Sequence, residues 1–295
     1  MKPAPFEYHR PSTVEEAATL LAEHDEAELM AGNQSLGIVM GNRLARPEHI
    51  VDLNGVDALS FIDVDTETVS IGALARHREI EQSTPLRENL PIFPEAAEQI
   101  AGPAVRNRGT LGGSLGEADP AGNYPALAVT LDATVHLTSA TGHRAVAAED
   151  FFLGYLFTAL EEGELIERVT VDRDPYPPER TGMAFLELKP AAQTWPTVSA
   201  AAVVRVADPA PQSVIEAARL GLANAADVPL RVPDAEAAIQ GGGVSEAVLD
   251  SVANAVTETA DPDDELHADP EFKTEAASAY ARRAVRTAYD RATAR

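Results

Sequence analysis

The hydrophobic pattern of the first sixty residues switches between helical and extended periods. Apolar positions of residues 14–21 fall on one face of a helix. Ser12 and Thr13 precede it, each followed by Glu three residues later, which is typical of a capping box at a helix start. Short apolar runs at 29–31 and 49–53 predict two strands. The pattern therefore predicts a small α/β unit.

Strands and helices mix along the next stretch of chain. Residues 61–64 and 69–73 flank the polar sequence DTET, as in a hairpin, and residues 134–138 alternate before a turn. Pro125 is suited to the first turn of a helix. The further expected elements are helices at 94–101 and 125–131 and a strand at 165–171.

The stretch DRDPYPPER, residues 172–180, carries three prolines and five charges and is the best candidate for a linker. The pattern changes after it. The expected elements are strands at 198–206 and 214–222 and helices at 235–239, 247–256 and 272–292. Strands followed by helices are typical of a separate α+β domain.

Charge and composition exclude several classes of protein. Lys and Arg total 23 against 47 Asp and Glu, a net charge of −24, which disfavours binding to nucleic-acid phosphates. No apolar run is long enough to span a membrane and the N-terminus lacks a secretory signal, so we expect a cytoplasmic protein. The absence of cysteine excludes disulfides, thiolate zinc sites and iron–sulfur clusters within this chain.

The acidic residues are spread along the chain, and lysine occurs only at positions 2, 189 and 273. A dispersed carboxylate surface favours a salt-adapted protein, because molar salt shortens the Debye length to roughly 3 Å and screens self-repulsion. We expect the fold or the assembly to be lost at low salt. Unchanged thermal unfolding between dilute buffer and molar KCl would instead indicate an ordinary acidic protein.

Two glycine-bearing segments are candidates for a phosphate site: GNQSLG at 32–37 and TLGGSLG at 110–116. Such loops turn main-chain N–H groups towards one point and bind phosphate oxygens without lysine. If the two faced each other, a diphosphate would fit between them, and Ser35, Thr110 and Ser114 would add hydroxyls. Neither segment is a GxGxxG fingerprint or a P-loop, and each taken singly is more often a plain turn.

The block AGPAVRNRGTLGGSLGEADPAGNYPALAVTLDA, residues 101–133, resembles the flavin-binding subunit of molybdenum hydroxylases. This family includes the medium subunit of carbon monoxide dehydrogenase and the flavin domain of xanthine dehydrogenase. LMAGNQSLGIVMGNRL at 29–44 and ARLGLANAADVPLR at 218–231 are also similar to it. The resemblance runs from about residue 3 to about residue 290.

The resemblance implies an α+β protein with a two-lobed FAD-binding fold of the vanillyl-alcohol-oxidase (PCMH) type and a smaller α+β C-terminal domain. The FAD-binding domain would span residues 1–175, with an N-terminal lobe at 1–57 and a middle lobe at 58–175. The C-terminal domain would span 182–292. FAD would lie between the two lobes.

The resemblance also implies the cofactor-binding residues. The residues expected at FAD are Ala31, Gly32, Asn33, Gln34, Ser35, Leu36, Thr110, Gly112, Gly113, Ser114, Asn123 and Lys189. The chain departs from the family pattern at Asn33, at Asn123, where many members have an acidic residue, and at KPAAQTWP from residue 189. Lys189 is either a cation near the flavin or a member of an ion pair. Trp195, the only tryptophan, is interpreted as packing in a domain interface or near the flavin.

No catalytic residue and no metal site are expected in the chain itself. It has no GxSxG motif, and none of its histidines is spaced with carboxylates as in a metal site. The histidines are His9, His24, His49, His77, His136, His143 and His267.

The family implies partners for this chain. A large molybdopterin subunit would oxidise the substrate, and a small subunit with [2Fe–2S] clusters would pass electrons to FAD here, in a dimer of heterotrimers. A stand-alone FAD-dependent oxidoreductase of the same fold is the alternative. A third interpretation is an acidic interaction module that binds no flavin.

Overall fold

The computed structural model describes residues 2–294, and its N-terminal unit is the predicted α/β unit. Its elements are β1 (Glu7–His9), α1 (Val14–Glu23), β2 (Ala27–Met30), α2 (Leu36–Gly41) and β3 (His49–Asp52). The strands form a parallel sheet in the order β1-β3-β2. Thr13 caps α1, since its Oγ1 accepts the Glu16 N–H at 3.1 Å. The Glu16 carboxylate accepts from the Ser12 N–H at 2.7 Å, so the reciprocal bond of the predicted capping box is displaced by one residue.

The middle of the chain forms an antiparallel sheet in the order β4-β5-β10-β6-β7, and the predicted hairpins are confirmed. The strands are β4 (Ile62–Val64), β5 (Thr68–Gly72), β6 (Thr134–Ser139), β7 (Gly142–Ala147) and β10 (Leu165–Asp172). The helices are α3 (His77–Gln82), α4 (Thr84–Asn89), α5 (Ile92–Gln99), α6 (Pro103–Arg106), α7 (Leu111–Glu117), α8 (Asn123–Thr130) and α9 (Ala148–Phe151). Two 3₁₀ turns (Leu53–Gly55 and Asp57–Leu59) and a small hairpin, β8 (Phe152–Gly154) with β9 (Phe157–Thr158), complete this part.

The second glycine segment is a helix, α7, and the prediction of an open loop there was wrong. Glycine is a poor helix former, which is why the sequence indicates a loop. Tertiary contact overrides this preference. A Cβ on Gly112 would lie 2.6 Å from Ala73 Cβ, and the N–H groups of Leu111 and Gly112 donate to carbonyls that follow β5. Glycine thus lets the start of α7 lie directly against that strand.

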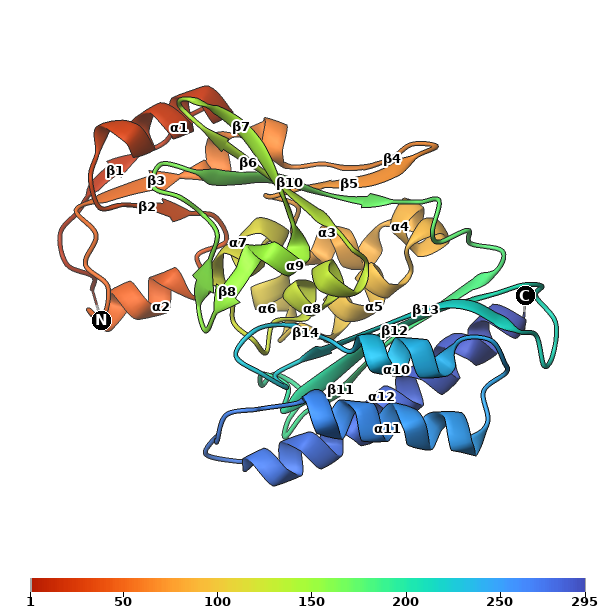
Figure 1. Cartoon of the computed structure of the whole chain (residues 1–295). Coiled ribbons are helices and arrows are strands. Elements are labelled where there is room, and N and C mark those ends of the chain that lie inside the picture. The colour runs from red at the N-terminus through yellow and green to blue at the C-terminus, as the bar shows by residue number, and fades with distance from the viewer. Residues whose placement is uncertain (1, 295) are drawn as a thin grey trace.

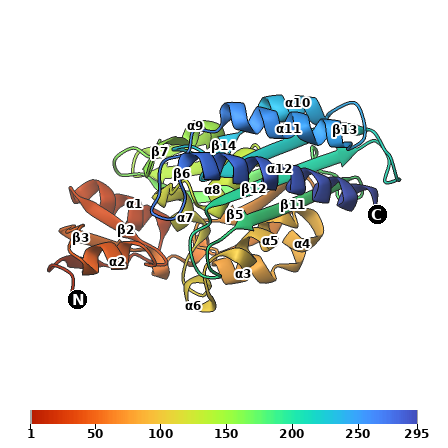
Figure 2. The same cartoon turned by 90° about the horizontal axis from the view of Figure 1, so that it is seen from below.

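The C-terminal part is an antiparallel sheet, β11-β12-β13-β14, covered on one face by helices. The strands are β11 (Thr181–Leu188), β12 (Val198–Val206), β13 (Ile215–Ala223) and β14 (Leu230–Arg231). The helices are α10 (Pro233–Ile239), α11 (Glu246–Thr259) and α12 (Pro270–Thr293). α12 runs across β11 and β12 (Figure 2). The sequence analysis missed β11, which begins immediately after the proline-rich stretch.

The layers of the molecule explain why the middle of β12, residues 200–204, is apolar at every position. Ala201 and Val203 pack into the core shared with the middle helices, whereas Ala200, Ala202 and Val204 pack against α10–α12. Figure 1 shows this order, from the middle sheet through its helices to the C-terminal sheet and then the C-terminal helices. A strand buried on both faces carries a continuous hydrophobic run. One face of β12 therefore belongs to the core of the middle lobe, which fixes the C-terminal sheet to that lobe.

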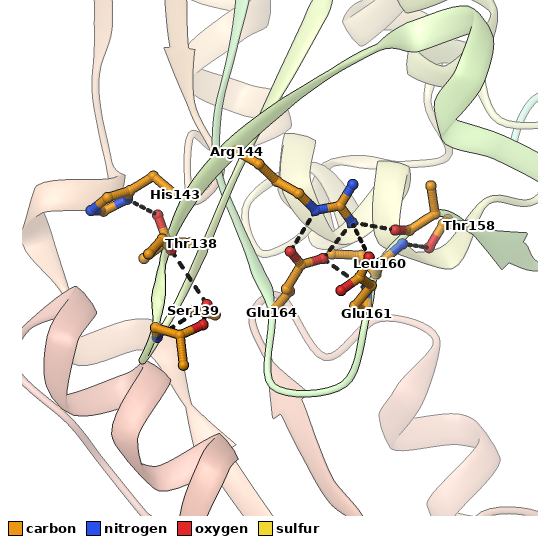
Figure 3. A network of polar contacts seen from close by, with 11 residues as sticks. Thr138, Ser139, His143, Arg144, Thr158, Leu160, Glu161 and Glu164 are labelled. Carbon is orange, nitrogen blue, oxygen red and sulfur yellow. Dashed lines mark hydrogen bonds and ion pairs between the residues drawn. The ribbon is translucent and has the colours of Figure 1, made fainter.

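A polar network beside the middle sheet fixes the turn that leads into β10 (Figure 3). The Arg144 guanidinium holds Glu164 in a two-point contact of 2.6 and 2.7 Å and also donates to the Ala159 carbonyl. The bond from Arg144 keeps the pKa of Glu164 below its ordinary value. A surface hollow lined by residues 139–144 and 161–164 lies beside this network. None of its lining residues belongs to the glycine segments.

Candidate cofactor-binding site

The first glycine segment follows the end of β2 and has a row of main-chain N–H groups that are free to donate hydrogen bonds. Within residues 2–294, the N–H groups of Gly32, Asn33, Gln34 and Ser35 have no hydrogen-bond acceptor. Asn33 has a φ of 58°, in the left-handed region. Consecutive N–H groups around a left-handed residue form a concave nest that binds anions. The segment therefore has the backbone geometry of a phosphate site.

The structure brings the first segment against residues 108–109, which directly precede the second segment. A Cβ on Gly32 would lie 2.4 Å from the Arg108 carbonyl oxygen and 2.7 Å from Gly109 Cα. Only glycine permits this approach of one backbone to another. Arg76 supports the contact, because its guanidinium donates to the Arg108 carbonyl and to the Asn54 side chain. Asn54 in turn donates to the Ala31 carbonyl at 2.8 Å.

The second segment offers fewer main-chain donors than the sequence suggested. The N–H groups of Leu111 and Gly112 donate to the carbonyls of Ala75 and Ala73 at 3.0 and 2.8 Å. The Gly113 N–H donates to Thr110 Oγ1 at 3.1 Å, and the Ser114 N–H donates to the Thr110 carbonyl. What remains for a ligand is the Thr110 N–H, the hydroxyls of Thr110 and Ser114, and the positive end of a short helix. The first segment thus carries most of the available donors.

Carboxyl groups also lie at this site, and burial alters them. Burial raises the pKa of Glu117, at the end of α7, while a hydrogen bond from Ser35 opposes that shift. Burial also raises the pKa of Asp119. Burial therefore disfavours the charged form of both carboxyl groups.

His77 lies beneath Gly109 and was missed by the sequence analysis. A Cβ on Gly109 would lie 2.4 Å from the imidazole Nε2 of His77. The main-chain N–H of His77 donates to the Gly109 carbonyl at 3.0 Å. The imidazole is 5.3 Å from the Tyr124 ring, and both His77 Nδ1 and Tyr124 Oη are buried without a hydrogen-bond partner. No feature of the sequence distinguishes His77 from the other histidines. Its role is to support the backbone of the second segment.

Burial makes His77 a source of acid sensitivity. Burial, with smaller effects from Arg76 and Arg106, lowers its pKa from 6.5 to about 4. The unfolded chain therefore binds one more proton than the folded chain between these values, so stability falls as the pH falls through this window. We expect His77 to account for a loss of about 3 kcal/mol in unfolding free energy between pH 7 and pH 4.

Denaturant titrations of the wild-type chain and of His77→Gln at both pH values measure this effect. Other groups titrate in both proteins, so the difference between the two curves isolates His77. Parallel pH dependences in the two proteins would show that His77 is not the group concerned.

Asn123 and Lys189 both interact with other residues of the chain, through hydrogen bonds and an ion pair. Asn123 is buried at the start of α8 and donates to the Ala96 carbonyl at 3.0 Å. Lys189 Nζ lies 2.7 Å from Glu187 Oε2 and also donates to the Gln99 carbonyl. The ion-pair interpretation of Lys189 therefore describes its contacts in this structure.

Trp195 does not fill a domain interface, and that interpretation was wrong. Its side chain is 55% exposed. It belongs to the segment that joins β11 and β12, in which Gln193 packs against Gly102 beside α6. The indole is thus available to a ligand or a partner.

The chain has a two-lobed α+β unit, a main-chain nest where the lobes meet, and a sheet-and-helix domain behind them. This combination is that of a protein that holds a phosphate-bearing cofactor. Residues 4–173 match the family model of the FAD binding domain in molybdopterin dehydrogenase. Residues 183–288 match the CO dehydrogenase flavoprotein C-terminal domain. The chain belongs to the family of FAD-binding medium subunits of molybdenum hydroxylases.

Relatives and solved structures agree with this assignment over the full length. The chain is 34% identical over 292 residues to the carbon monoxide dehydrogenase medium chain of Hydrogenophaga pseudoflava, covering 99% of both chains. A structure of carbon monoxide dehydrogenase from the same organism superposes with a TM-score of 0.93 at 36% identity, again over 99% of both. Quinoline 2-oxidoreductase from Pseudomonas putida 86 superposes with a TM-score of 0.92 at 31% identity, covering 99% of this chain and 100% of that one.

These comparisons confirm the α+β fold class, the family and the assignment to oxidoreductase subunits. Among residues 2–294, no helix combines the length and the apolar character needed to cross a membrane.

Proposed function

We propose that this chain binds FAD and serves as the electron-transfer subunit of a molybdenum hydroxylase. The observation that carries the proposal is the nest of free N–H groups at 32–35, held against the backbone of residues 108–109. The family domain at residues 4–173 supports FAD as the cofactor. A diphosphate satisfies such donors in a chain whose net charge of −24 leaves few side-chain cations for it.

The residues around the nest fit a flavin dinucleotide. The N–H groups of residues 32–35, with Leu36 at the start of α2, would hold the diphosphate, and the hydroxyls of Ser35, Thr110 and Ser114 would add donors. Asn123 already donates to the Ala96 carbonyl and Lys189 to Glu187 and the Gln99 carbonyl, which leaves each of them fewer donors for the cofactor. They are therefore second in importance to the main-chain donors.

When bound, FAD would accept electrons from a [2Fe–2S] cluster of a partner and deliver them to an external acceptor. The contribution of this chain is to bind and orient the cofactor. The buried His77 packs against Gly109 and Tyr124, and its pKa, lowered to about 4, makes it a weak base. The full-length similarity to medium chains of carbon monoxide dehydrogenase favours an electron-transfer subunit over a stand-alone oxidoreductase.

Exposed apolar side chains mark where partner subunits would dock. The β8–β9 hairpin exposes Leu153, Tyr155, Leu156 and Phe157, each by about half or more of its surface. Such a contiguous apolar stretch on a soluble protein is typical of an interaction surface. The relatives named above are chains of multi-subunit enzymes. We therefore place a cluster-bearing or molybdenum-bearing subunit at this hairpin, within a dimer of heterotrimers.

Three further expectations belong to the same proposal. The domains divide at residues 1–175 and 182–292, with the lobes meeting near residue 57; the separate sheets support this division. The protein works in the cytoplasm. It is adapted to high salt, for which the support is its dispersed acidic composition.

Purification in molar KCl, alone and with the large and small subunits of a molybdenum hydroxylase, tests the function. We expect a yellow chain with one FAD, which is reduced when the reduced cluster-bearing partner is added. FAD reduced directly by an organic substrate without a partner would favour the stand-alone oxidoreductase. A colourless chain that takes up no added FAD would contradict both.

A further inference from the structure

Three histidines that are far apart in sequence meet at the N-terminal sheet. His9 ends β1, His24 follows α1, and His49 begins β3. The register pairs Glu7 with His49 and His9 with Val51, so the side chains of these four residues lie on one face of the sheet. The same face packs on α1, since Val51 shares a core with Ala17 and Ala18. The fold thus places the end of α1, with His24, over the two strand histidines.

The three imidazoles are close enough to share one ion. One ring nitrogen from each lies within 4.8 Å of the others, and His9 Nε2 is 3.0 Å from His49 Nδ1. A tetrahedral zinc ion holds its nitrogen ligands at about 2.1 Å, which separates them by about 3.4 Å. Small side-chain rotations bring the three nitrogens to that spacing. All three rings are half-buried, which leaves a path for an ion to enter.

A fourth ligand is available on the solvent side. Glu7 Oε2 lies 3.8 Å from His49 Nδ1, and the Glu7 side chain is largely exposed. Carboxylate oxygen is a common fourth ligand where three imidazoles bind zinc, with water as the substitute. Imidazole ligands select borderline first-row ions over magnesium or calcium.

We propose that His9, His24 and His49, with Glu7 or water, bind one divalent first-row transition ion of the zinc type. The ion would join β1, the end of α1 and β3. β1 is only three residues long and forms the edge of its sheet, so such a link would secure the N-terminal strand. The spacing of histidines along the sequence does not indicate this cluster. The parallel sheet brings together residues that are far apart in the chain.

The proposed site is separate from the cofactor site. His49 lies at the beginning of β3, paired with Ala27 at the beginning of β2, whereas the phosphate segment leaves the far end of β2. β1, α1 and β3 lie together at one end of the molecule in both views (Figures 1 and 2). Loss of the metal is therefore expected to leave FAD content unchanged.

The test uses the full chain, freed of any affinity tag and stripped with a chelator, in molar KCl. Titration calorimetry with Zn²⁺ is expected to give one ion per chain, and Co²⁺ is expected to give the visible absorption of a tetrahedral site. His24→Gln should weaken Zn²⁺ binding at least tenfold. His267→Gln is the matched control, because His267 is exposed and lies outside the cluster, and it should bind as the wild type does.

X-ray absorption at the zinc edge of the wild-type chain supplies a measurement that needs no variant. Three imidazole ligands support the proposal. The proposal would be overturned by fewer than two imidazole ligands, by binding of less than one ion per two chains, or by equal Zn²⁺ affinity in folded His24→Gln and wild type. In that case the rings form only the stacked, hydrogen-bonded cluster seen here, with centroids 4.1 to 5.3 Å apart.

Discussion

Gly32→Ala is expected to abolish retention of FAD while leaving the protein folded. The added Cβ would lie 2.4 Å from the Arg108 carbonyl oxygen and 2.7 Å from Gly109 Cα, and both neighbours are backbone. The first segment must therefore move away from residues 108–109, which removes the contact on which the proposed diphosphate site depends. We expect FAD to bind at least about a hundredfold more weakly, which corresponds to ~3 kcal/mol. Flavin absorbance after desalting and a fluorescence titration with FAD measure the effect.

Gly116→Ala is the matched control for this substitution. Gly116 lies in the second glycine segment, within α7, and the nearest atom to its added Cβ is 3.8 Å away, an ordinary contact. Alanine also favours a helix more than glycine does. We expect Gly116→Ala to retain FAD fully. Equal FAD affinity in Gly32→Ala and wild type would mean that the diphosphate does not lie at this contact.

Gly182→Ala is expected to destabilise the C-terminal domain strongly. Gly182 in β11 faces α12, and an added Cβ would lie 1.9 Å from the Ala288 carbonyl oxygen and 2.5 Å from the Ala292 N atom. Neither backbone atom can move without lifting the helix from the sheet. Overpacking of this kind costs about 3 kcal/mol in unfolding free energy, or more. Denaturant unfolding in molar KCl, followed by circular dichroism, measures the loss.

Gly242→Ala is the control for this second substitution, because nothing lies within 4 Å of its added Cβ. We expect its unfolding free energy to stay within about 0.5 kcal/mol of wild type, as for most surface changes. If Gly182→Ala unfolded at the same denaturant concentration as Gly242→Ala, the close packing of α12 on β11 would be wrong.

Hydrophobic periodicity was enough to predict most elements of this fold. The helix from residue 14, the hairpins of the middle sheet and the three C-terminal helices all have periods that match their burial. Periodicity failed for short elements such as β1, α3 and α4, and where glycine and proline dominate the local sequence. Residues 111–117 are helical because Gly112 packs on Ala73, and β11 begins beside a proline-rich stretch that suggested only a linker.

The candidate site was predictable in position but not in detail. The glycine content of residues 32–37 and 110–116 indicated two segments near a ligand, and the structure places Gly32 against residues 108–109, directly before the second segment. The sequence could not show that the main-chain N–H groups of Leu111 and Gly112 donate to the carbonyls of Ala75 and Ala73. Such contacts depend on long-range packing, as does the meeting of His9, His24 and His49.

A crystal structure of the FAD-loaded chain tests the central claim most directly. The diphosphate should lie within hydrogen-bond distance of the N–H groups of residues 32–35, beside Gly109. A structure in which the diphosphate binds elsewhere, with those N–H groups facing solvent or protein, would contradict the proposed site.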